Sequence, residues 1–330
     1  MNIIDMAGTI INDDLNALLR IARPNLKETT IHNYMISIGK IHRTLNKNSE
    51  KITTECLRDS DKFTDYVSNL KSDNTKKNAY NIAVVFLMAE QAKPTINENG
   101  DNDNTTADLI KLYTKERDIL NKKYTAFTQT HEKSVKQAEN WLSYEELENI
   151  AKSYKNTDYQ KYAILTFHLN IALRNDLQSI KVMNEKQYEK TEDKTMLNVI
   201  IKMTPKMKLK TGLINEDYII YLNNYKTSGA YKEKIIIVPK ILSPIITKLI
   251  QLNINKENSY LVLNKGEAFK NNEFTRYFNK IIAHTGKKIS TTLLRNIVLS
   301  HKYGDTVKEM KKVASDMCHS ESTQKAYIKY

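Results

Sequence analysis

Cysteine is scarce in this chain of 330 residues, which contains only Cys56 and Cys318. Two isolated thiols form no disulfide framework and no cysteine-rich zinc site, and they indicate a reducing compartment. Apolar runs stay well short of the ~18 residues that a membrane helix needs. The first residues show no basic stretch followed by an apolar core, which argues against a secretory signal. The sequence therefore predicts a protein that is neither secreted nor embedded in a membrane.

Motifs for metal and nucleotide binding are also missing. The sequence contains no spaced set of Asp and Glu residues with a metal-site pattern, and no glycine-rich Walker loop. We therefore expect no metal site and no cofactor. Any phosphate chemistry would have to be done by the protein's own side chains.

The composition is that of a basic, folded protein. Hydrophobic residues make up 40% of the chain, and its length allows two domains with separate cores. The formal net charge is +13 and the pI is about 9.3, which points to a polyanionic partner, most often nucleic acid. Many Lys, Asn and Ile residues also fit a second explanation, an AT-rich genome. Composition alone does not separate the two.

Helical spacing dominates the first part of the chain. Apolar residues recur at helical intervals over 29–46, 54–70, 75–92 and 106–130. A polar loop rich in Asn and Asp separates the last two segments. We predict one helical domain over 1–135 and a second domain over 136–330.

The second domain mixes helices with a few strands. Ser143 and Glu146 form a capping box that starts a helix, and residues 158–173 are apolar nearly all round, as in a buried helix. Runs rich in Ile and Val predict strands over 198–203, 217–226 and 233–239. Helical spacing returns over 240–253, 272–285, 291–303 and 306–317. The predicted fold class is mainly α, with a small antiparallel β-hairpin or sheet in the C-terminal domain.

The segment 183–216 allows two interpretations. It carries four lysines, Lys202, Lys206, Lys208 and Lys210. It is either a basic strand that follows the DNA backbone or a solvated insertion. We favour the insertion.

Two arginines stand in contexts suited to binding phosphate. Arg174 follows the buried helix in "NIALRNDL", and Arg295 lies in "STTLLRNIVLSH". A guanidinium is planar, always charged and able to grip two phosphate oxygens at once. Arg174 has a competing explanation, a salt bridge to Asp176, because an unpaired buried charge is costly. The sequence leaves both open.

Three further residues complete a candidate constellation. Lys226 comes just before a predicted tight turn, where a solvated edge lysine is the plain alternative. His319 and Tyr327 occur together in "CHSESTQKAYIKY". Tyr330 is a rival nucleophile, but its spacing from His319 is longer, and we favour Tyr327.

Together these residues resemble the active site of the tyrosine recombinases, the DNA strand-transfer family that includes phage integrases. The likeness covers roughly 142–330 and includes a "His-Ser … Thr-x-x-x-Tyr" ending. The first 130 residues resemble the family's DNA-gripping helical domain only loosely. Two positions depart from the pattern. Thr292 stands where the family has His or Lys, and a threonine can donate a hydrogen bond but cannot act as a cation. Cys318 stands where glycine is usual.

The resemblance implies a role for each residue. Tyr327 attacks a DNA phosphate and forms a 3′-phosphotyrosyl link, which conserves the energy of the broken bond. The two arginines and His319 stabilise the charge that builds on the phosphate oxygens. A hairpin lysine protonates the leaving 5′ oxygen. Lys226 is the first candidate for that role, ahead of Lys232 and Lys234.

The function implied is that of a site-specific DNA recombinase or integrase of a virus or mobile element. It would act on double-stranded DNA without metal or ATP, as four protomers that exchange strands in pairs. It would work inside the cell, in the nucleus or cytoplasm of a host or in a virion, wherever its target DNA lies. The alternatives are a type IB topoisomerase or telomere resolvase, and a decayed relative that only binds DNA, which Thr292 makes conceivable. A helical RNA-binding protein fits less well, because no RNA-binding motif occurs.

Overall fold

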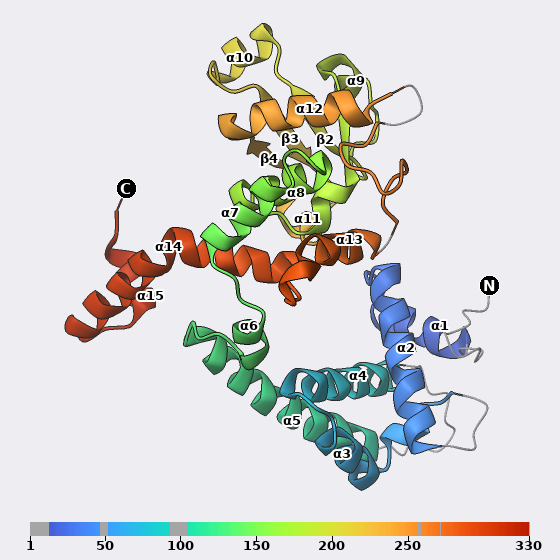
Figure 1. The fold of residues 1–330 in the computed structure, drawn as a ribbon. Helices are drawn as coiled ribbons and strands as arrows, with labels where there is room; N and C mark the ends of the chain where they lie inside the picture. Colours follow the sequence, from blue (N-terminus) through green and yellow to red (C-terminus); the bar gives the residue numbers. More distant parts are fainter. Residues whose placement is uncertain (1–12, 47–51, 93–103, 256–258, 271, 330) are drawn as a thin grey trace. The chain divides into compact units, whose positions relative to one another are not determined.

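The computed structural model describes residues 13–46, 52–92, 104–255, 259–270 and 272–329. The chain divides into two compact units, Met1–Glu132 and Lys133–Tyr330 (Figure 1). Helices make up most of the described structure, and no described helix is both long enough and apolar enough to cross a membrane. The functions predicted for residues 1–135 and 136–330 stay predictions.

The first unit is helical, as predicted. Its elements are α1 (Asp13–Ala22), α2 (Glu28–Leu45), the 3-10 helix η1 (Glu55–Leu57), α3 (Ser60–Ser68), α4 (Asp73–Gln91) and α5 (Asn104–Gln129). Helix α4 is its central element, because it packs on α1, α2, α3 and α5. Ser72 caps α4 by accepting a hydrogen bond from the backbone N–H of Thr75. The sequence prediction of one helix over 54–70 is wrong, since η1 and α3 share that stretch.

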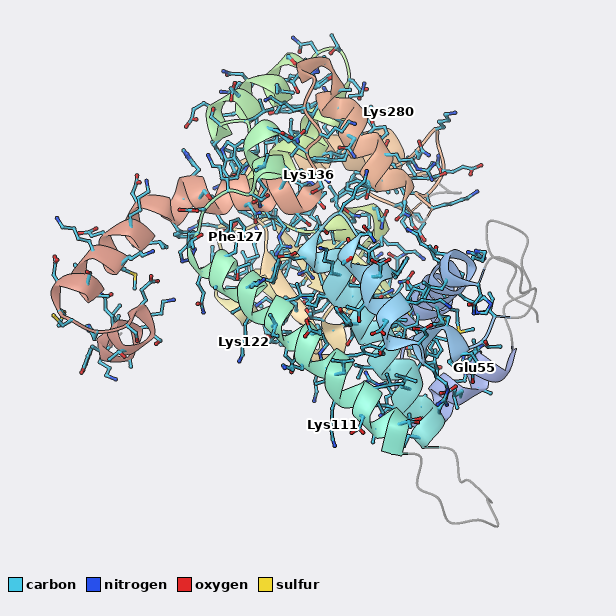
Figure 2. The ribbon with its side chains drawn as sticks, turned by 90° about the horizontal axis from the view of Figure 1, so that it is seen from below. Glu55, Lys111, Lys122, Phe127, Lys136 and Lys280 are labelled. Carbon is cyan, nitrogen blue, oxygen red and sulfur yellow. The ribbon has the colours of Figure 1, made fainter. Side chains whose placement is uncertain are left out.

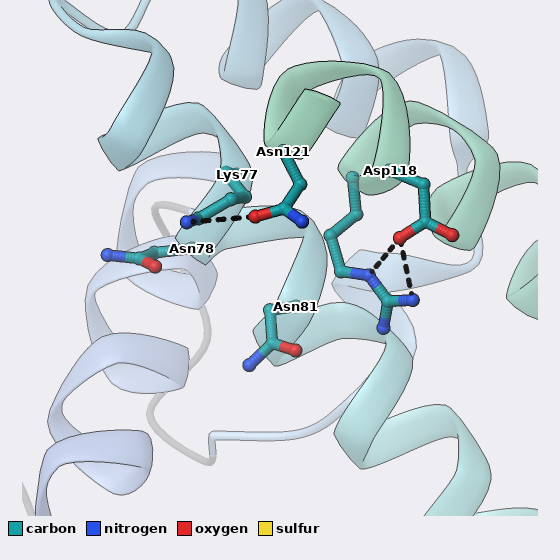
Figure 3. Close-up of a pocket in the computed structure, with 6 residues that line it drawn as sticks. Lys77, Asn78, Asn81, Asp118 and Asn121 are labelled. Carbon is teal, nitrogen blue, oxygen red and sulfur yellow. Dashed lines mark hydrogen bonds and ion pairs between the residues drawn. The ribbon is translucent and has the colours of Figure 1, made fainter. Parts of the chain in front are cut away.

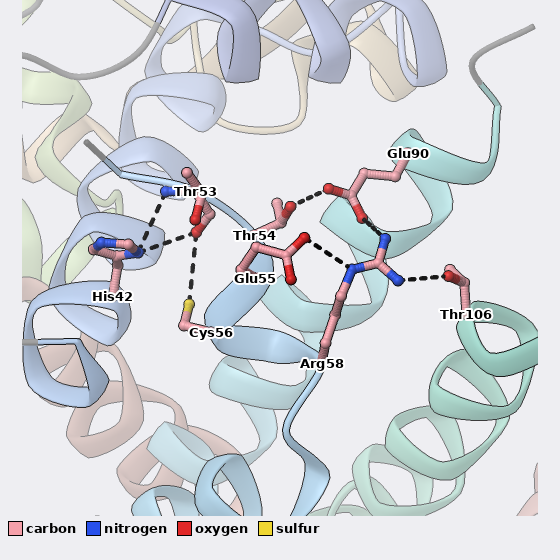
Figure 4. Close-up of polar contacts among 8 residues, drawn as sticks. All are labelled: His42, Thr53, Thr54, Glu55, Cys56, Arg58, Glu90 and Thr106. Carbon is pink, nitrogen blue, oxygen red and sulfur yellow. Dashed lines mark hydrogen bonds and ion pairs between the residues drawn. The ribbon is translucent and has the colours of Figure 1, made fainter. Parts of the chain in front are cut away.

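A polar network ties η1 to α4 and α5 (Figure 4). Arg58 bonds Glu90 at 3.2 Å, Thr106 at 3.1 Å and Glu55 at 3.3 Å. Thr54 also donates to Glu90. These contacts satisfy charges that are partly withdrawn from water, which is the condition for tolerating them there. Near the network, burial raises the pKa of the Cys56 thiol to about 12, so this thiol stays protonated and unreactive.

The outer side of α5 is both basic and apolar. Lys111, Lys122 and Phe127 project from this helix (Figure 2). Phe127 is 42% exposed and Tyr124 48% exposed, so large rings remain in contact with solvent. Side chains of this kind, interleaved with lysines, are common on surfaces that contact nucleic acid.

The second unit contains the strands and the remaining helices. Its helices are α6 (Val135–Glu139), α7 (Tyr144–Ser153), α8 (Tyr159–Asn170), η2 (Asn175–Ser179), α9 (Glu185–Glu189), α10 (Pro205–Thr211), α11 (Ser228–Tyr231), η3 (Lys240–Leu242), α12 (Ser243–Asn253), α13 (Glu273–Ile282), η4 (Ala283–Thr285), α14 (Thr291–Asp316) and α15 (Glu321–Tyr327). The capping box predicted for Ser143 and Glu146 is confirmed at the start of α7. The predicted buried helix is confirmed as α8, whose residues Ala163–Leu165 are fully buried.

The sheet is mixed, which corrects the prediction of an antiparallel hairpin or sheet. Its four strands run in the order β1 (Ile180–Met183), β2 (Asn198–Lys202), β3 (Tyr218–Leu222) and β4 (Lys234–Ile237). β1 pairs with β2 in parallel, while β2–β3 and β3–β4 are antiparallel. Strand β1 was not predicted, because it is only four residues long and one of them is a lysine.

The sheet has a buried face on each side. One face, with Ile200 and Ile220, joins the main core formed with α8, α12, α13 and α14. The other, with Val199 and Ile201, packs on Met207 of α10 and on Tyr188 of α9 in a smaller core. Alternate residues of β2 therefore point to different cores, as the pleat requires. The preference for a solvated insertion over 183–216 is wrong, because this segment supplies a central strand and the cover of the second face.

Helix α14 runs without a break where two helices were predicted. It spans Thr291–Asp316, and the residues between the predicted segments 291–303 and 306–317 are helical. The sequence suggested an interruption because Gly304 and Asp305 are weak helix formers. One glycine costs a helix only about 1 kcal/mol, which flanking helical residues overcome.

Replacement of Gly304 by alanine tests this continuous helix. A Cβ at this position would have no heavy atom within 4 Å outside the local helix, so alanine fits without strain. We expect the free energy of unfolding to rise by about 0.5–1 kcal/mol, because alanine restricts the unfolded chain more than glycine does. Urea denaturation measures the change. A loss of stability would show that the helix is interrupted at this position.

Candidate active site

Arg174 lies at the junction between α8 and η2. It forms the N-cap position of η2, and its backbone carbonyl lies 3.2 Å from Nε2 of His168. The other ring nitrogen of His168, Nδ1, lies 2.8 Å from the carbonyl oxygen of Ile164. His168 is fully buried, so this ring fixes the backbone of Arg174 against the core helix.

Asn175 connects this junction to two other helices. Its Nδ2 donates to the Thr275 hydroxyl of α13 at 2.9 Å. Its Oδ1 accepts a 2.8 Å hydrogen bond from the Thr291 hydroxyl at the start of α14. Thr291 is one helical turn before Arg295, so the two lie on the same side of α14. The Asn175 amide therefore sets the backbone of Arg174 beside the helix that carries Arg295.

The charge of Arg174 lies close enough to act on Arg295. Burial lowers the pKa of Arg295, the positive charge of Arg174 lowers it further, and Asp176 opposes the shift. Nε of Arg295 is buried and has no hydrogen-bond partner among the described residues. Like charges repel, and they repel more strongly where one of them, here the half-buried Arg295, is partly out of water. An arrangement of this kind is favourable when an anion binds between the guanidinium groups.

Asp176 stands next to this pair without neutralising it directly. Its pKa is raised by burial, and the backbone N–H of Arg174 and the charges of Arg174 and Arg295 oppose that change. Among the described residues Arg174 forms no ion pair with Asp176. The salt bridge that competed with phosphate binding in the sequence is thus not formed. The arginine head group keeps its hydrogen-bond donors for another partner.

Lys226 lies in the loop that joins β3 to β4. The side chain is exposed, and the loop contains the short helix α11 where a simple Ser-Gly turn was predicted. The buried Asn198 holds this loop beside η2. Its Nδ2 donates to the Asn224 carbonyl and to the Ser179 hydroxyl, both at 2.8 Å. Lys226 and Arg174 therefore belong to segments anchored on one side chain, which supports grouping them in one site.

Thr292 is exposed in the first turn of α14. Its neighbour Thr291 is buried and makes the hydrogen bond to Asn175 described above. Thr292 lies three residues before Arg295, within one turn of the same helix. The contact between Thr292 and a phosphate stays a prediction.

His319 is placed by the end of α14. The His319 N–H donates to the Ala314 carbonyl at 3.1 Å, and the Cys318 N–H donates to the Ser315 carbonyl at 3.0 Å. Cys318 has a φ of 54°. These bonds and this left-handed residue form a Schellman motif, the helix ending that usually contains glycine. The structure thus gives a physical reason for the glycine that the recombinase pattern has at the position of Cys318.

Tyr327 is the last residue of α15. Ser320 caps this helix by accepting a 3.1 Å hydrogen bond from the Thr323 N–H. Its seven residues bring Tyr327 back to His319, with ring centroids 5.6 Å apart and an interplanar angle of 61°. Tyr327 is 69% exposed, and Nε2 of His319 is buried without a hydrogen-bond partner in the described part of the chain. Tyr330 lies outside the described residues.

The predicted site residues form two groups, one at each end of α14. Arg174, Arg295 and the Lys226 loop lie near its N-terminal part, and His319 and Tyr327 follow its C-terminal end. Asp316 comes 21 residues after Arg295, which is roughly 32 Å along a helix axis. Figure 1 shows α15 at the end of α14 that points away from α13. In this conformation the chain does not bring its own Tyr327 to its own arginines.

Three positioning residues were missed from the sequence: His168, Asn175 and Asn198. Each acts through contacts with segments distant in the chain, as in the pairing of Asn175 with Thr291. His168 and Asn175 lie before and after Arg174 in "HLNIALRN". Polar residues beside a buried helix end were the only available signal.

The buried imidazole of His168 predicts a pH dependence of stability. Burial lowers its pKa from the ordinary value of 6.5, so the folded ring stays neutral while the unfolded ring takes up a proton. The free energy of unfolding should then fall as pH drops below about 6.5, by up to ~1.4 kcal/mol per pH unit for this one group. The stability difference between the wild type and His168→Gln, measured by urea denaturation between pH 7.5 and pH 5.5, isolates the effect. A difference that does not change with pH would contradict it.

The left-handed conformation of Cys318 predicts that a glycine would stabilise the end of α14. A non-glycine residue in this region is strained by roughly 1 kcal/mol. We expect Cys318→Gly to raise the melting temperature, and Cys318→Val to lower it because a β-branched residue fits this region worst. Differential scanning calorimetry of both variants provides the comparison. Equal melting temperatures would argue against this ending.

A polar groove lies between α4 and α5 in the first unit (Figure 3). Its volume is about 390 Å³. The lining residues are Lys77, Asn78, Asn81, Arg117, Asp118 and Asn121. Lys77 donates to Asn121 at 3.5 Å, and Arg117 pairs with Asp118 at 2.9 Å. Amides, an ammonium and a guanidinium are the groups that hydrogen-bond with the edges of bases and with phosphates.

Comparison with known proteins gives little further guidance. No protein-family model and no curated protein matches the chain. Among solved structures it is similar to the crystal structure of XerA recombinase, with 16% sequence identity over 86% of this chain and 81% of that chain. The TM-score is 0.34, which is too low to carry an argument. A proposal on function therefore has to rest on the residues of this chain.

Proposed function

We propose that this protein is a DNA strand transferase of the tyrosine-recombinase type that cuts and rejoins double-stranded DNA at specific sites. The observation that carries the proposal is the hydrogen bond from Thr291 to Asn175, which joins the segment of Arg174 to the helix of Arg295 although the two arginines lie 121 residues apart in the sequence. The exposed guanidinium of Arg174 and the half-buried guanidinium of Arg295 together make a site for one phosphate group. The pairing of His319 with Tyr327 supplies a phenol and an imidazole for the reaction.

The chemistry follows from these groups. The Tyr327 oxygen attacks the phosphorus and gives up its proton to the surrounding water, the bond from phosphorus to the 5′ oxygen breaks, and that oxygen takes up a proton. Lys226 supplies this proton. The product is a 3′-phosphotyrosyl diester and a free 5′ hydroxyl. In the reverse step, the 5′ hydroxyl of the same or of another DNA end attacks the phosphorus and releases Tyr327. The two arginines stabilise the negative charge on the non-bridging oxygens.

The first unit would hold the duplex while this reaction proceeds. The polar groove between α4 and α5, with its exposed Asn78 and Asn121, supports a contact with DNA there. The lysines and rings on the outer side of α5 offer a second contact surface. The net charge of +13 favours a polyanionic partner for both. A viral or mobile-element integrase that acts as a tetramer is the more specific form of the proposal, implied by the resemblance of the active-site motifs.

Incubation with nicked duplexes that carry candidate target sites tests the proposal. A nick close to the cleavage position makes the strand that carries the free 5′ hydroxyl short, so this strand diffuses away after cleavage. Religation then has no 5′ hydroxyl, and the covalent intermediate accumulates. We expect a protein–DNA species that survives denaturation and needs neither ATP nor a divalent cation. Its absence with all candidate sites, while DNA is still bound, would leave a second function, DNA binding without cleavage. The separation of Tyr327 from the arginines and the presence of Thr292 favour that second function. Relaxation of supercoiled DNA without any specific site would instead indicate a topoisomerase.

A further inference from the structure

We propose that the buried phenol of Tyr188 is a positioning residue for Lys226, because it joins the two ends of the loop that carries this lysine. The inference rests on the proposed function, in which Lys226 protonates the leaving 5′ oxygen. Tyr188 belongs to α9, within the segment 183–216, and only 8% of it is exposed. It acts through the loop and does not itself touch the phosphate.

The Tyr188 hydroxyl contacts both ends of the loop between β3 and β4. It donates to Oε2 of Glu233, the residue just before β4, at 2.6 Å. It accepts a hydrogen bond at 3.2 Å from Nδ2 of Asn223, the residue just after β3. Burial and the bond to Glu233 raise the pKa of Tyr188 to about 12, so the phenol keeps its proton at neutral pH. A bond from a hydroxyl to a carboxylate at this length is one of the stronger hydrogen bonds in proteins.

The ring of Tyr188 is fixed by the smaller core on the second face of the sheet. It belongs to this core together with Val199 and Ile201 of β2. It also stacks on Tyr221 of β3, with ring centroids 4.7 Å apart and an interplanar angle of 27°. A buried ring that is stacked in this way keeps one orientation. Its hydroxyl is therefore a fixed point to which the loop is attached.

The loop itself is closed by contacts among its own residues. The Lys232 N–H donates to the Ser228 carbonyl at 2.8 Å, and the Tyr225 hydroxyl donates to the Lys232 carbonyl at 2.8 Å. Lys232 has φ 53° and ψ −146°, a conformation that glycine favours and that persists only where neighbouring contacts impose it. A loop closed in this way moves as a unit. The contacts at its two ends then set the place of Lys226.

The two ends of the loop are held by different groups. Asn198 accepts hydrogen bonds from the N–H groups of Asn223 and Asn224, at 3.1 and 3.0 Å, and so holds the first end. Backbone pairing with β3 holds β4 from Lys234 onward. In the part of the chain that the structure describes, Glu233 makes no side-chain hydrogen bond or ion pair other than that with Tyr188. The phenol is thus the group that ties the second end to the first.

A leaving group that needs no proton separates this role from a purely structural one. The nicked duplex is prepared in two forms, with oxygen or with sulfur at the bridging 5′ position of the bond to be cleaved. A thiolate leaves without being protonated, because thiols are far more acidic than alcohols. A defect in proton delivery should therefore appear with the oxygen duplex and disappear with the sulfur duplex.

Tyr188→Phe keeps the stacked ring and removes only the hydroxyl. We expect the initial rate of adduct formation on the oxygen duplex to fall by about 10–10²-fold, as when a catalytic group is misplaced. On the sulfur duplex the rate should differ from wild type by less than about twofold. Lys226→Ala should recover on the sulfur duplex in the same way. Arg295→Ala should stay impaired on both, because it stabilises charge on the non-bridging oxygens whichever atom leaves.

Three further variants isolate the hydroxyl and its partner. Tyr221→Phe removes the hydroxyl of the other stacked ring, which has no hydrogen-bond partner among the described residues, and should leave both rates unchanged. Glu233→Ala removes the acceptor at an exposed position. It should reproduce the defect on the oxygen duplex, and it keeps the test valid if Tyr188→Phe does not fold. Glu233→Gln loses the same charge but keeps an oxygen acceptor, so most of the activity should return.

The two duplexes also separate this inference from the proposed function. Equal losses on both duplexes for Tyr188→Phe and Glu233→Ala would overturn the positioning role, and so would full activity of both variants on the oxygen duplex. In either case adduct formation by the wild type leaves the proposed function standing. Wild type that forms no adduct on any candidate site, with oxygen or with sulfur, overturns both.

Discussion

Replacement of Arg295 by alanine should lower the rate of covalent adduct formation by about 10²–10³-fold, the usual cost of removing one donor from a site that stabilises developing charge. The reason lies in the surroundings of this side chain. Burial and the nearby Arg174 lower the pKa of Arg295, and its Nε has no partner among the described residues. Such a guanidinium contributes far more when a phosphate binds than in the empty site.

Two control variants make this result specific. Arg276→Ala removes an exposed arginine of α13 in the same unit and should change the rate by less than about twofold, as expected for an ordinary surface position. Arg295→Lys should remain strongly impaired, because an ammonium lacks the planar fork of a guanidinium. Binding to the duplex, measured by fluorescence anisotropy, should weaken only modestly in Arg295→Ala and in both control variants. Full activity of Arg295→Ala would remove this residue from the site.

Replacement of Tyr327 by phenylalanine should abolish the covalent adduct while binding to DNA stays nearly unchanged. Phenylalanine keeps the ring but lacks the oxygen that attacks phosphorus. Because Tyr327 is exposed, the change should have little effect on folding. Denaturing gel electrophoresis of the trapped complex measures the loss.

Two other tyrosines serve as controls for this result. Tyr303→Phe changes another exposed phenol on α14 and should leave the adduct intact. Tyr330→Phe removes the rival nucleophile and should also leave it intact. An adduct that persists in Tyr327→Phe and disappears in Tyr330→Phe would transfer the role to Tyr330.

The helices were predictable where local chemistry determines them. The apolar spacing over 29–46 became α2, and the capping box at Ser143 became the start of α7. The errors arose where the structure depends on competing energies or on pairing with distant segments, which local sequence patterns do not show. Gly304 suggested a break in α14, yet its cost is small beside that of interrupting a helix of 26 residues. Strand β1 was not predicted because it is stabilised as a strand by its pairing with β2, which the local sequence does not show.

The candidate site shows the same division between local and distant information. Arg174 and Arg295 could be selected because each stands in a recognisable sequence context. Their approach could not be predicted, because it depends on Asn175 and Thr291, which are 116 residues apart. The position of Tyr327 depends on the length of α14 and so on whether that helix is continuous. A pattern of residue types does not contain that information.

Mass-spectrometric identification of the amino acid joined to DNA is the most direct test of the account. The trapped complex would be digested with protease and nuclease, and the modified peptide sequenced. We predict a single modified residue, Tyr327, linked to a 3′ phosphate. A link to another residue, or a phosphate joined through its 5′ end, would contradict the assignment of the nucleophile and the direction of cleavage.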